Sequence, residues 1–307
     1  MRRKPRPQAE GMALGEFSWA FFGLLSGTLA AVMLLMQEWL KVEGFALAFW
    51  CKVSCAIVTL PFVIYYGLPT DPLFYAWLFP QAALFVIADV SLFRNLPVVG
   101  AGVISRLLPG TVVAGFFLWF AVAPSEIKLY LDNPVLSLMI ISVLCAAAFF
   151  ATRLRKCDVS MRAVKIMWFV LFANTVSPLL AKITTRYANT TQGAFGFTFA
   201  EALMMLAMWL VWLFVAKPVP ISVLMAKDTL KKGLCIGVVT STMVVVTVAS
   251  LYFIDNPAYV CALQLIYAPI IIVVNKWMGK DDGSDIRSGL GIVACSAALI
   301  ILKTQLN

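Results

Sequence analysis

Long apolar runs alternate with short polar turns along the chain, and the turns include RNLP at 94–97 and IDNP at 254–257. A helix that crosses a bilayer needs about 20 predominantly apolar residues. Runs of about this length lie at 17–36, 44–65, 72–93, 97–120, 135–152, 163–181, 193–216, 232–254, 257–276 and 286–303. The pattern therefore predicts ten transmembrane helices.

The segments outside these runs are short. Residues 1–16 open with the basic, proline-containing sequence MRRKPRPQAE, which predicts a disordered tail. The apolar run behind the tail has no small-residue cleavage site close by, so we expect an uncleaved anchor. The longest connector, 217–231, predicts at most an amphipathic segment.

Composition agrees with a membrane protein. Apolar residues make up 62% of the 307 residues and charged residues only 13%, against roughly 45–50% and 25% in soluble domains. A soluble globule of this size could not cover so much apolar surface with so few charges. The composition excludes a soluble domain and predicts an all-α integral membrane protein whose partner is the lipid bilayer, not nucleic acid.

Several kinds of chemistry are absent from the sequence. There is no histidine, no C-x-x-C pair among the seven cysteines, and no Walker-type phosphate loop. These absences remove the Ser-His and Cys-His nucleophile pairs, the commonest metal ligand and direct drive by ATP. We therefore expect no enzyme, no cofactor and no metal site, and we interpret the cysteines as packing residues.

The two halves of the chain share a pattern of residues. Two prolines twelve residues apart occur in both halves, at an offset of 160: Pro97 and Pro109, then Pro257 and Pro269. At an offset of 149, three further pairs match in position: Trp19 with Trp168, Gly44 with Gly193, and Lys52 with Glu201. This predicts two five-helix repeats, 1–155 and 156–307. Because five is odd, the second repeat would enter the membrane from the opposite side.

The stretch from 256 to 302 resembles the end of an EamA-type repeat of the drug/metabolite transporter superfamily. It has a small-residue helix with a central proline, Pro269, then a polar turn and a glycine-rich last helix with Gly289 and Gly291. The first half carries a similar pattern at 97–118. The resemblance implies a ten-helix basket around a central cavity, alternating access, and a bacterial inner (plasma) membrane location. We leave open whether the chain is a monomer or a homodimer.

Orientation is left open by two opposing indications. The resemblance places both termini in the cytoplasm. With the N-terminus inside, however, eight Lys and Arg residues fall in cytoplasmic tails and loops and fourteen on the opposite side. The positive-inside rule favours the reverse. We take the N-terminus as cytoplasmic, because the first charged cluster often dominates.

Ionisable residues inside the predicted spans are the first candidates for a site, because charges in a membrane are expensive. Lys52 and Glu201 each lie about eight residues into a helix, near the middle of the bilayer core. Their opposite signs predict an ion pair, which either holds the two helices together or contacts substrate. Arg106 is a candidate anion anchor, and the alternative is a salt bridge to Asp89.

Polar and aromatic residues near the helix prolines supply further candidates, because proline frees a backbone carbonyl. Gln81, Asn174, Gln264 and Tyr267 fit this description, although hydrogen bonding between helices explains each as well. Trp19 could stack on a substrate, but packing is an equally ordinary role for it.

The leading functional hypothesis is a secondary transporter of a small anionic or zwitterionic metabolite, such as an amino acid or another carboxylate. The alternatives are a carrier or flippase for a phosphorylated or lipid-linked substrate, and a membrane subunit that transports nothing. The direction of transport, and a proton cycle through Asp89 or Glu201, stay open.

Overall fold

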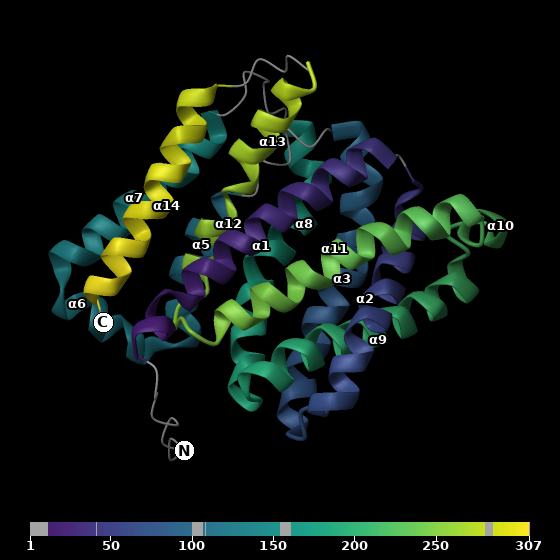
Figure 1. Cartoon of the computed structure of the whole chain (residues 1–307), viewed down its shortest axis with the longest axis horizontal. Helices are drawn as coiled ribbons and strands as arrows, with labels where there is room; N and C mark the ends of the chain where they lie inside the picture. The colour runs from purple at the N-terminus through teal and green to yellow at the C-terminus, as the bar shows by residue number, and fades with distance from the viewer. Residues whose placement is uncertain are drawn as a thin grey trace.

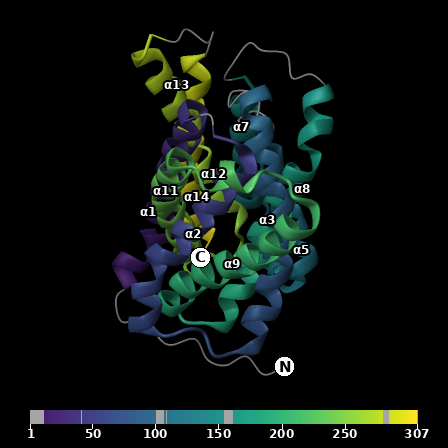
Figure 2. The same ribbon diagram turned by 90° about the vertical axis from the view of Figure 1, so that its right-hand side faces the viewer.

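A computed structural model describes residues 12–40, 42–99, 107, 109–153, 161–279 and 285–306. Within these ranges the chain is built from helices and turns (Figures 1 and 2). The first half contains α1 (Met12–Leu40), α2 (Gly44–Tyr66), α3 (Pro72–Val99), α5 (Pro109–Val122), η1 (Pro124–Glu126), α6 (Ile127–Asp132) and α7 (Pro134–Arg153). The second contains α8 (Met161–Thr184), η2 (Thr185–Tyr187), α9 (Thr190–Ala216), α10 (Ile221–Leu224), α11 (Lys227–Leu251), α12 (Ala258–Gln264), α13 (Tyr267–Trp277) and α14 (Ile286–Leu306).

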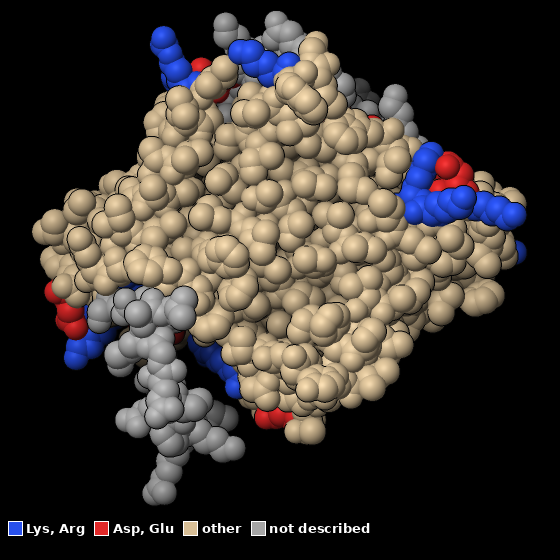
Figure 3. Space-filling view, viewed as in Figure 1, with Lys and Arg blue, Asp and Glu red and all other residues tan. Residues whose placement is uncertain are grey.

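Among the described residues, nine helices are long and apolar enough to cross a membrane. A tenth span results if α5 and the segment Pro124–Asp132, which meet at a bend of 102°, are taken together. The side chains on the outside include large apolar ones such as Ile64, Val211 and Phe214. On the face drawn in Figure 3, charged residues lie toward the margins and the broad centre has none. The protein is therefore an all-α, multi-pass membrane protein.

Three differences between the helix boundaries and the predicted runs are the most informative. α1 begins at Met12, inside the predicted tail. The predicted turn at 94–97 is helical, because α3 continues to Val99. α11 begins at Lys227 instead of residue 232 and ends at Leu251. The helices extend into charged sequence, which apolar runs cannot detect; at α11, an ion pair of 2.6 Å between Asp228 and Lys232 supports the first turns. Most of the predicted fourth run before Pro109, residues 100–106 and 108, lies outside the described residues.

Side-chain caps fix where two central helices begin. The Glu43 carboxylate accepts a hydrogen bond of 2.8 Å from the backbone N–H of Ala46, at the start of α2. Asn189 accepts one of 3.0 Å from the N–H of Gln192, at the start of α9. Each cap satisfies a backbone donor that has no partner within the helix.

The predicted ninth span is interrupted near its middle. α12 ends at Gln264 and α13 begins at Tyr267. Pro269 has no N–H to donate to Leu265, and the carbonyl of Leu265 accepts from Ala268 at 3.0 Å instead. The tighter turn that results divides the span into two short helices.

The packing of the helices brings distant parts of the sequence together. α2 packs against α9 and α11, and α3 packs against α8 and α9. α1 lies along α11 and α12, and α7 lies along α14 (Figure 1). At the contact of α2 and α11, two glycines allow close approach: Gly233 faces Trp50, and Gly237 faces Ser54. The interior of the protein is therefore shared between both halves of the chain.

Candidate functional site

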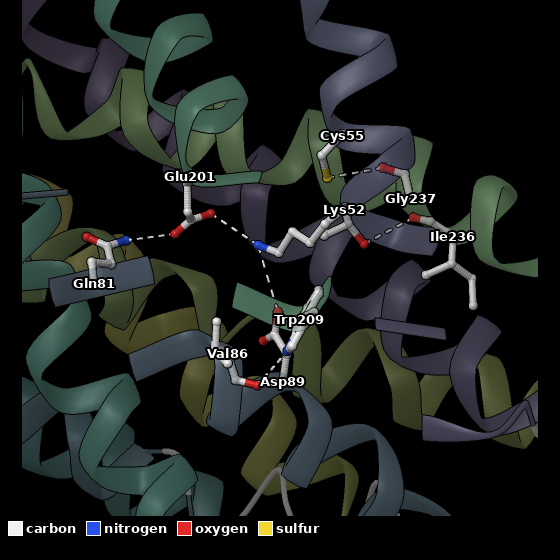
Figure 4. A network of polar contacts seen from close by, with 10 residues as sticks. Lys52, Cys55, Gln81, Val86, Asp89, Glu201, Trp209, Ile236 and Gly237 are labelled. Carbon is white, nitrogen blue, oxygen red and sulfur yellow. Dashed lines mark hydrogen bonds and ion pairs between the residues drawn. The ribbon is translucent and has the colours of Figure 1, made fainter. Parts of the chain in front are cut away.

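A cluster of buried charged residues lies where α2, α3 and α9 meet (Figure 4). Lys52 of α2 donates to Glu201 Oε2 of α9, with 3.1 Å between the nitrogen and the oxygen. Asp89 of α3 lies farther away, with 3.8 Å between Lys52 Nζ and Asp89 Oδ2. The ion pair predicted between Lys52 and Glu201 is therefore present, and Asp89 adds a second carboxylate beside the same lysine.

The two carboxylates differ in how firmly they are held. Both oxygens of Glu201 have a donor, because Gln81 Nε2 donates to Oε1 at 3.3 Å. The side chain of Glu201 is 4% exposed, whereas that of Asp89 is 17% exposed. Within the described residues, the contact of Asp89 is the long one to Lys52. Glu201 is thus fixed in the core, and Asp89 is the more accessible of the two.

A cavity of about 230 Å³, open along part of its surface, adjoins this cluster. Lys52, Asp89 and Glu201 line it together with polar side chains from α3, α8, α11 and α12, namely Gln81, Asn174, Ser177, Thr240, Thr247 and Gln264. The remaining wall is apolar. A concave, mainly apolar space with a few converging polar groups is the usual form of a small-molecule site.

A second group of polar side chains joins three helices at the cavity wall. Gln264, the last residue of α12, donates through Nε2 to Ser26 Oγ of α1 at 2.7 Å and to Thr247 Oγ1 of α11 at 3.0 Å. The two hydroxyls are 2.5 Å apart. This group lies directly before the break in the ninth span, so the interruption has polar contacts on its cavity side.

The other predicted site residues have different surroundings. Asn174 lines the cavity, but its amide donates to the carbonyl of Val170 at 2.8 Å. Trp19 and Tyr267 are buried and are not among the residues that line the cavity. Trp19 packs edge-on against Tyr259, with ring centroids 6.1 Å apart. The Tyr267 hydroxyl has no hydrogen-bond partner within the described part of the chain.

Arg106, the predicted anion anchor, lies outside the described residues. The structure therefore describes only Asp89 of the alternative pair, and a salt bridge between Arg106 and Asp89 stays a prediction. Asp89 itself faces Lys52, a partner that sequence adjacency did not suggest.

Three polar residues of the cavity region were missed from the sequence: Ser26, Thr240 and Thr247. Ser26 and Thr247 are small polar residues in apolar surroundings, and Thr240 begins a run of three small polar residues, 240–242. In a membrane helix such a hydroxyl commonly donates to the carbonyl four residues earlier. Thr247 and Thr240 do make that bond, to Met243 and Ile236. Only the three-dimensional arrangement distinguishes them from such residues elsewhere.

In the described part of the chain, no group of three or more His, Cys, Asp and Glu residues is placed to hold a metal ion. Cys51 and Cys55 are buried on α2 against the carbonyls of Gly233 and Gly237, which is a packing role.

No protein-family model matches the chain, and no curated protein matches it in sequence. Fold and cavity together define the class: a helical, multi-pass membrane protein with charged residues on the wall of a cavity between its helices.

Proposed function

We propose that the chain is a secondary transporter of a small anionic or zwitterionic metabolite. The observation that carries the proposal is the cluster of Lys52, Asp89 and Glu201 on the wall of a cavity inside a bundle of apolar helices. Charged residues in a membrane interior are expensive, and they commonly mark the path of a substrate or ion. A structural ion pair alone would not need a third charge or an adjoining cavity.

The size of the cavity favours a small substrate. Its volume of about 230 Å³ is below the range of roughly 300–1,000 Å³ that is typical of drug-sized ligands. A lipid-linked substrate would need a larger space, so the carrier or flippase alternative has less support. Among the described cavity residues, one cation and two carboxylates favour a zwitterion over a simple anion.

The helix pairing supports the proposal of two inverted repeats. Equivalent repeats allow each helix of the first half to be exchanged with its counterpart in the second. The counterparts are α1 and α8, α2 and α9, α3 and α11, α5 and α12–α13, and α7 and α14. Under this exchange the pairing of α1 with α11 becomes that of α8 with α3, and both are present. The pairing of α2 with α11 likewise becomes that of α9 with α3. Such pairing suits alternating access, in which the repeats rock around a site near the middle of the membrane.

The family likeness to EamA-type transporters, the inner-membrane location and a cytoplasmic N-terminus belong to the same proposal. They rest on the sequence patterns of the first half and of residues 256–302. Alternating access needs no cofactor in this chain, because a substrate or ion gradient supplies the energy.

Transport can be measured with the purified chain in liposomes. The expected result is exchange of a labelled amino acid or small carboxylate from a mixed panel, at a rate above that of empty liposomes. The variant Lys52→Met should abolish exchange, since it removes the described cavity cation. Tm shifts by the same compounds give an independent measure, because a ligand bound only to the folded state raises stability. The proposal is wrong if no compound is exchanged and none raises the Tm.

A further inference from the structure

We infer that Asp89 binds the positively charged end of the substrate, and that this substrate is an amine with an apolar tail. The inference rests on the proposed transport function and goes beyond it by assigning one subsite and one chemical class.

The charge balance of the cavity is the first step. The described cavity wall carries one lysine and two carboxylates, so a single positive charge faces two negative ones. Taking an unbalanced charge out of water costs several kcal/mol even after relaxation. A ligand that brings a positive charge would restore the balance, whereas a simple anion would oppose both carboxylates.

The geometry of the cluster determines which carboxylate is available. Glu201 already accepts hydrogen bonds at both oxygens, from Lys52 and from Gln81. The contact of Asp89 with Lys52, 3.8 Å, is longer than the roughly 2.7–2.9 Å typical of a charge-assisted hydrogen bond. Asp89 therefore has acceptor capacity left, and its side chain is the more exposed of the two.

A second acceptor beside the same cavity also lacks a donor. Gln81 directs its Nε2 donor to Glu201, which fixes the orientation of the amide, because a carboxylate can only accept. Its Oε1 is buried and has no hydrogen-bond partner within the described ranges. An ammonium group brings three donors and no acceptor, which matches a wall that is short of donors.

The remainder of the cavity wall determines the rest of the ligand. Large apolar side chains from α1, α3, α9 and α11 face the cavity, including Met33, Phe85, Leu92, Phe93, Phe197 and Val244. Such a wall suits a branched or aromatic hydrocarbon tail. The expected ligand is therefore an amine with an apolar tail, and a carboxylate next to the nitrogen makes it the zwitterion of the proposed function.

Three matched probes test this assignment on the purified full chain in detergent: leucine, 3-methylbutylamine, which lacks the carboxylate, and 4-methylpentanoate, which lacks the amine. Leucine and the amine should bind more tightly than the acid, by about 10- to 150-fold, the range for a hydrogen bond to a charged group. Asp89→Asn should remove that preference. Asp71→Asn, which removes a carboxylate that caps the start of α3, should keep it.

The outcomes separate the subsite from the transport function. If the acid binds as tightly as the amine, or if Asp89→Asn leaves amine binding unchanged, the assignment of Asp89 is wrong, while transport of the acid in liposomes would keep the proposed function. If no probe binds, the assignment is also wrong; if in addition no compound is transported, both proposals fail. The comparison of probes uses the unaltered protein, so it holds even where Asp89→Asn does not fold. Asp89→Glu, which keeps the charge, should retain the preference for amines.

Discussion

Lys52 is the centre of the charged cluster, because both carboxylates in it are paired with this one side chain. Removing one partner of a buried ion pair usually destabilises a protein by about 3–5 kcal/mol, because the other charge stays buried without compensation. The three members are therefore unequal. Without Lys52, two carboxylates lose their cation. Without Glu201, Lys52 still has Asp89.

This inequality predicts the order of two substitutions. Lys52→Met should lower the free energy of unfolding more than Glu201→Gln does. In a double-mutant cycle, the two should show a coupling of about 0.5–3 kcal/mol. Unfolding in mixed micelles, followed by circular dichroism, measures all four proteins. Additive losses, or a larger loss from Glu201→Gln, would contradict the arrangement described here.

Close helix contacts depend on residues without a side chain. At Gly237 of α11, an added Cβ would overlap the side chain of Ser54 and lie 2.8 Å from the carbonyl oxygen of Cys51. Both neighbours belong to α2 and lie within two residues of Lys52. The distance between α2 and α11 thus determines where the lysine is placed. In a membrane, small residues at helix interfaces serve this close approach.

Gly237→Ala is therefore expected to push α11 away from α2, with a loss of stability of about 1–3 kcal/mol, the usual result of overpacking. Gly110→Ala is the matched control on α5, because nothing lies within 4 Å of the Cβ that it would add. The control should be neutral or stabilising, since alanine is the better helix former. Thermal unfolding in detergent compares the two. Equal effects would show that the contact of α2 with α11 is not tight.

The chain as a whole has its described ends on one side of the bundle, with the start of α1 near the end of α14 (Figure 1). This placement agrees with an even number of crossings, in which α5 and the bent segment after it count as one. The bend of 102° between them makes this the span that most needs testing.

Cysteine labelling checks the number of crossings. After removal of the native cysteines, single cysteines at positions 5 and 306 should react with a membrane-impermeant reagent from the same side. The cytoplasmic side is expected for both. Labelling from opposite sides would exclude ten crossings. Labelling of both from outside would reverse the orientation and favour the charge count in the loops.

Much of this architecture could be read from the sequence, because the contrast between apolar runs and polar turns is strong. The offset of 149 also paired Lys52 with Glu201 correctly. Contacts between helices that are distant in sequence were not predictable. For Asp89 the sequence offers a salt bridge with Arg106 as one alternative, and nothing in it indicates the contact with Lys52. For Trp19 and Tyr267, an apolar helix gave no sign of which face meets the cavity.

The contact between Lys52 and Glu201 joins one residue from each half of the chain. On the proposal of two repeats, identical halves would bring together two lysines or two glutamates, and like charges repel each other there. A homodimer of either present half would therefore place two like charges in contact at this position. On that proposal, the two halves are complementary at this position and are not interchangeable. Because both halves belong to one chain, the half that carries Lys52 always meets the half that carries Glu201.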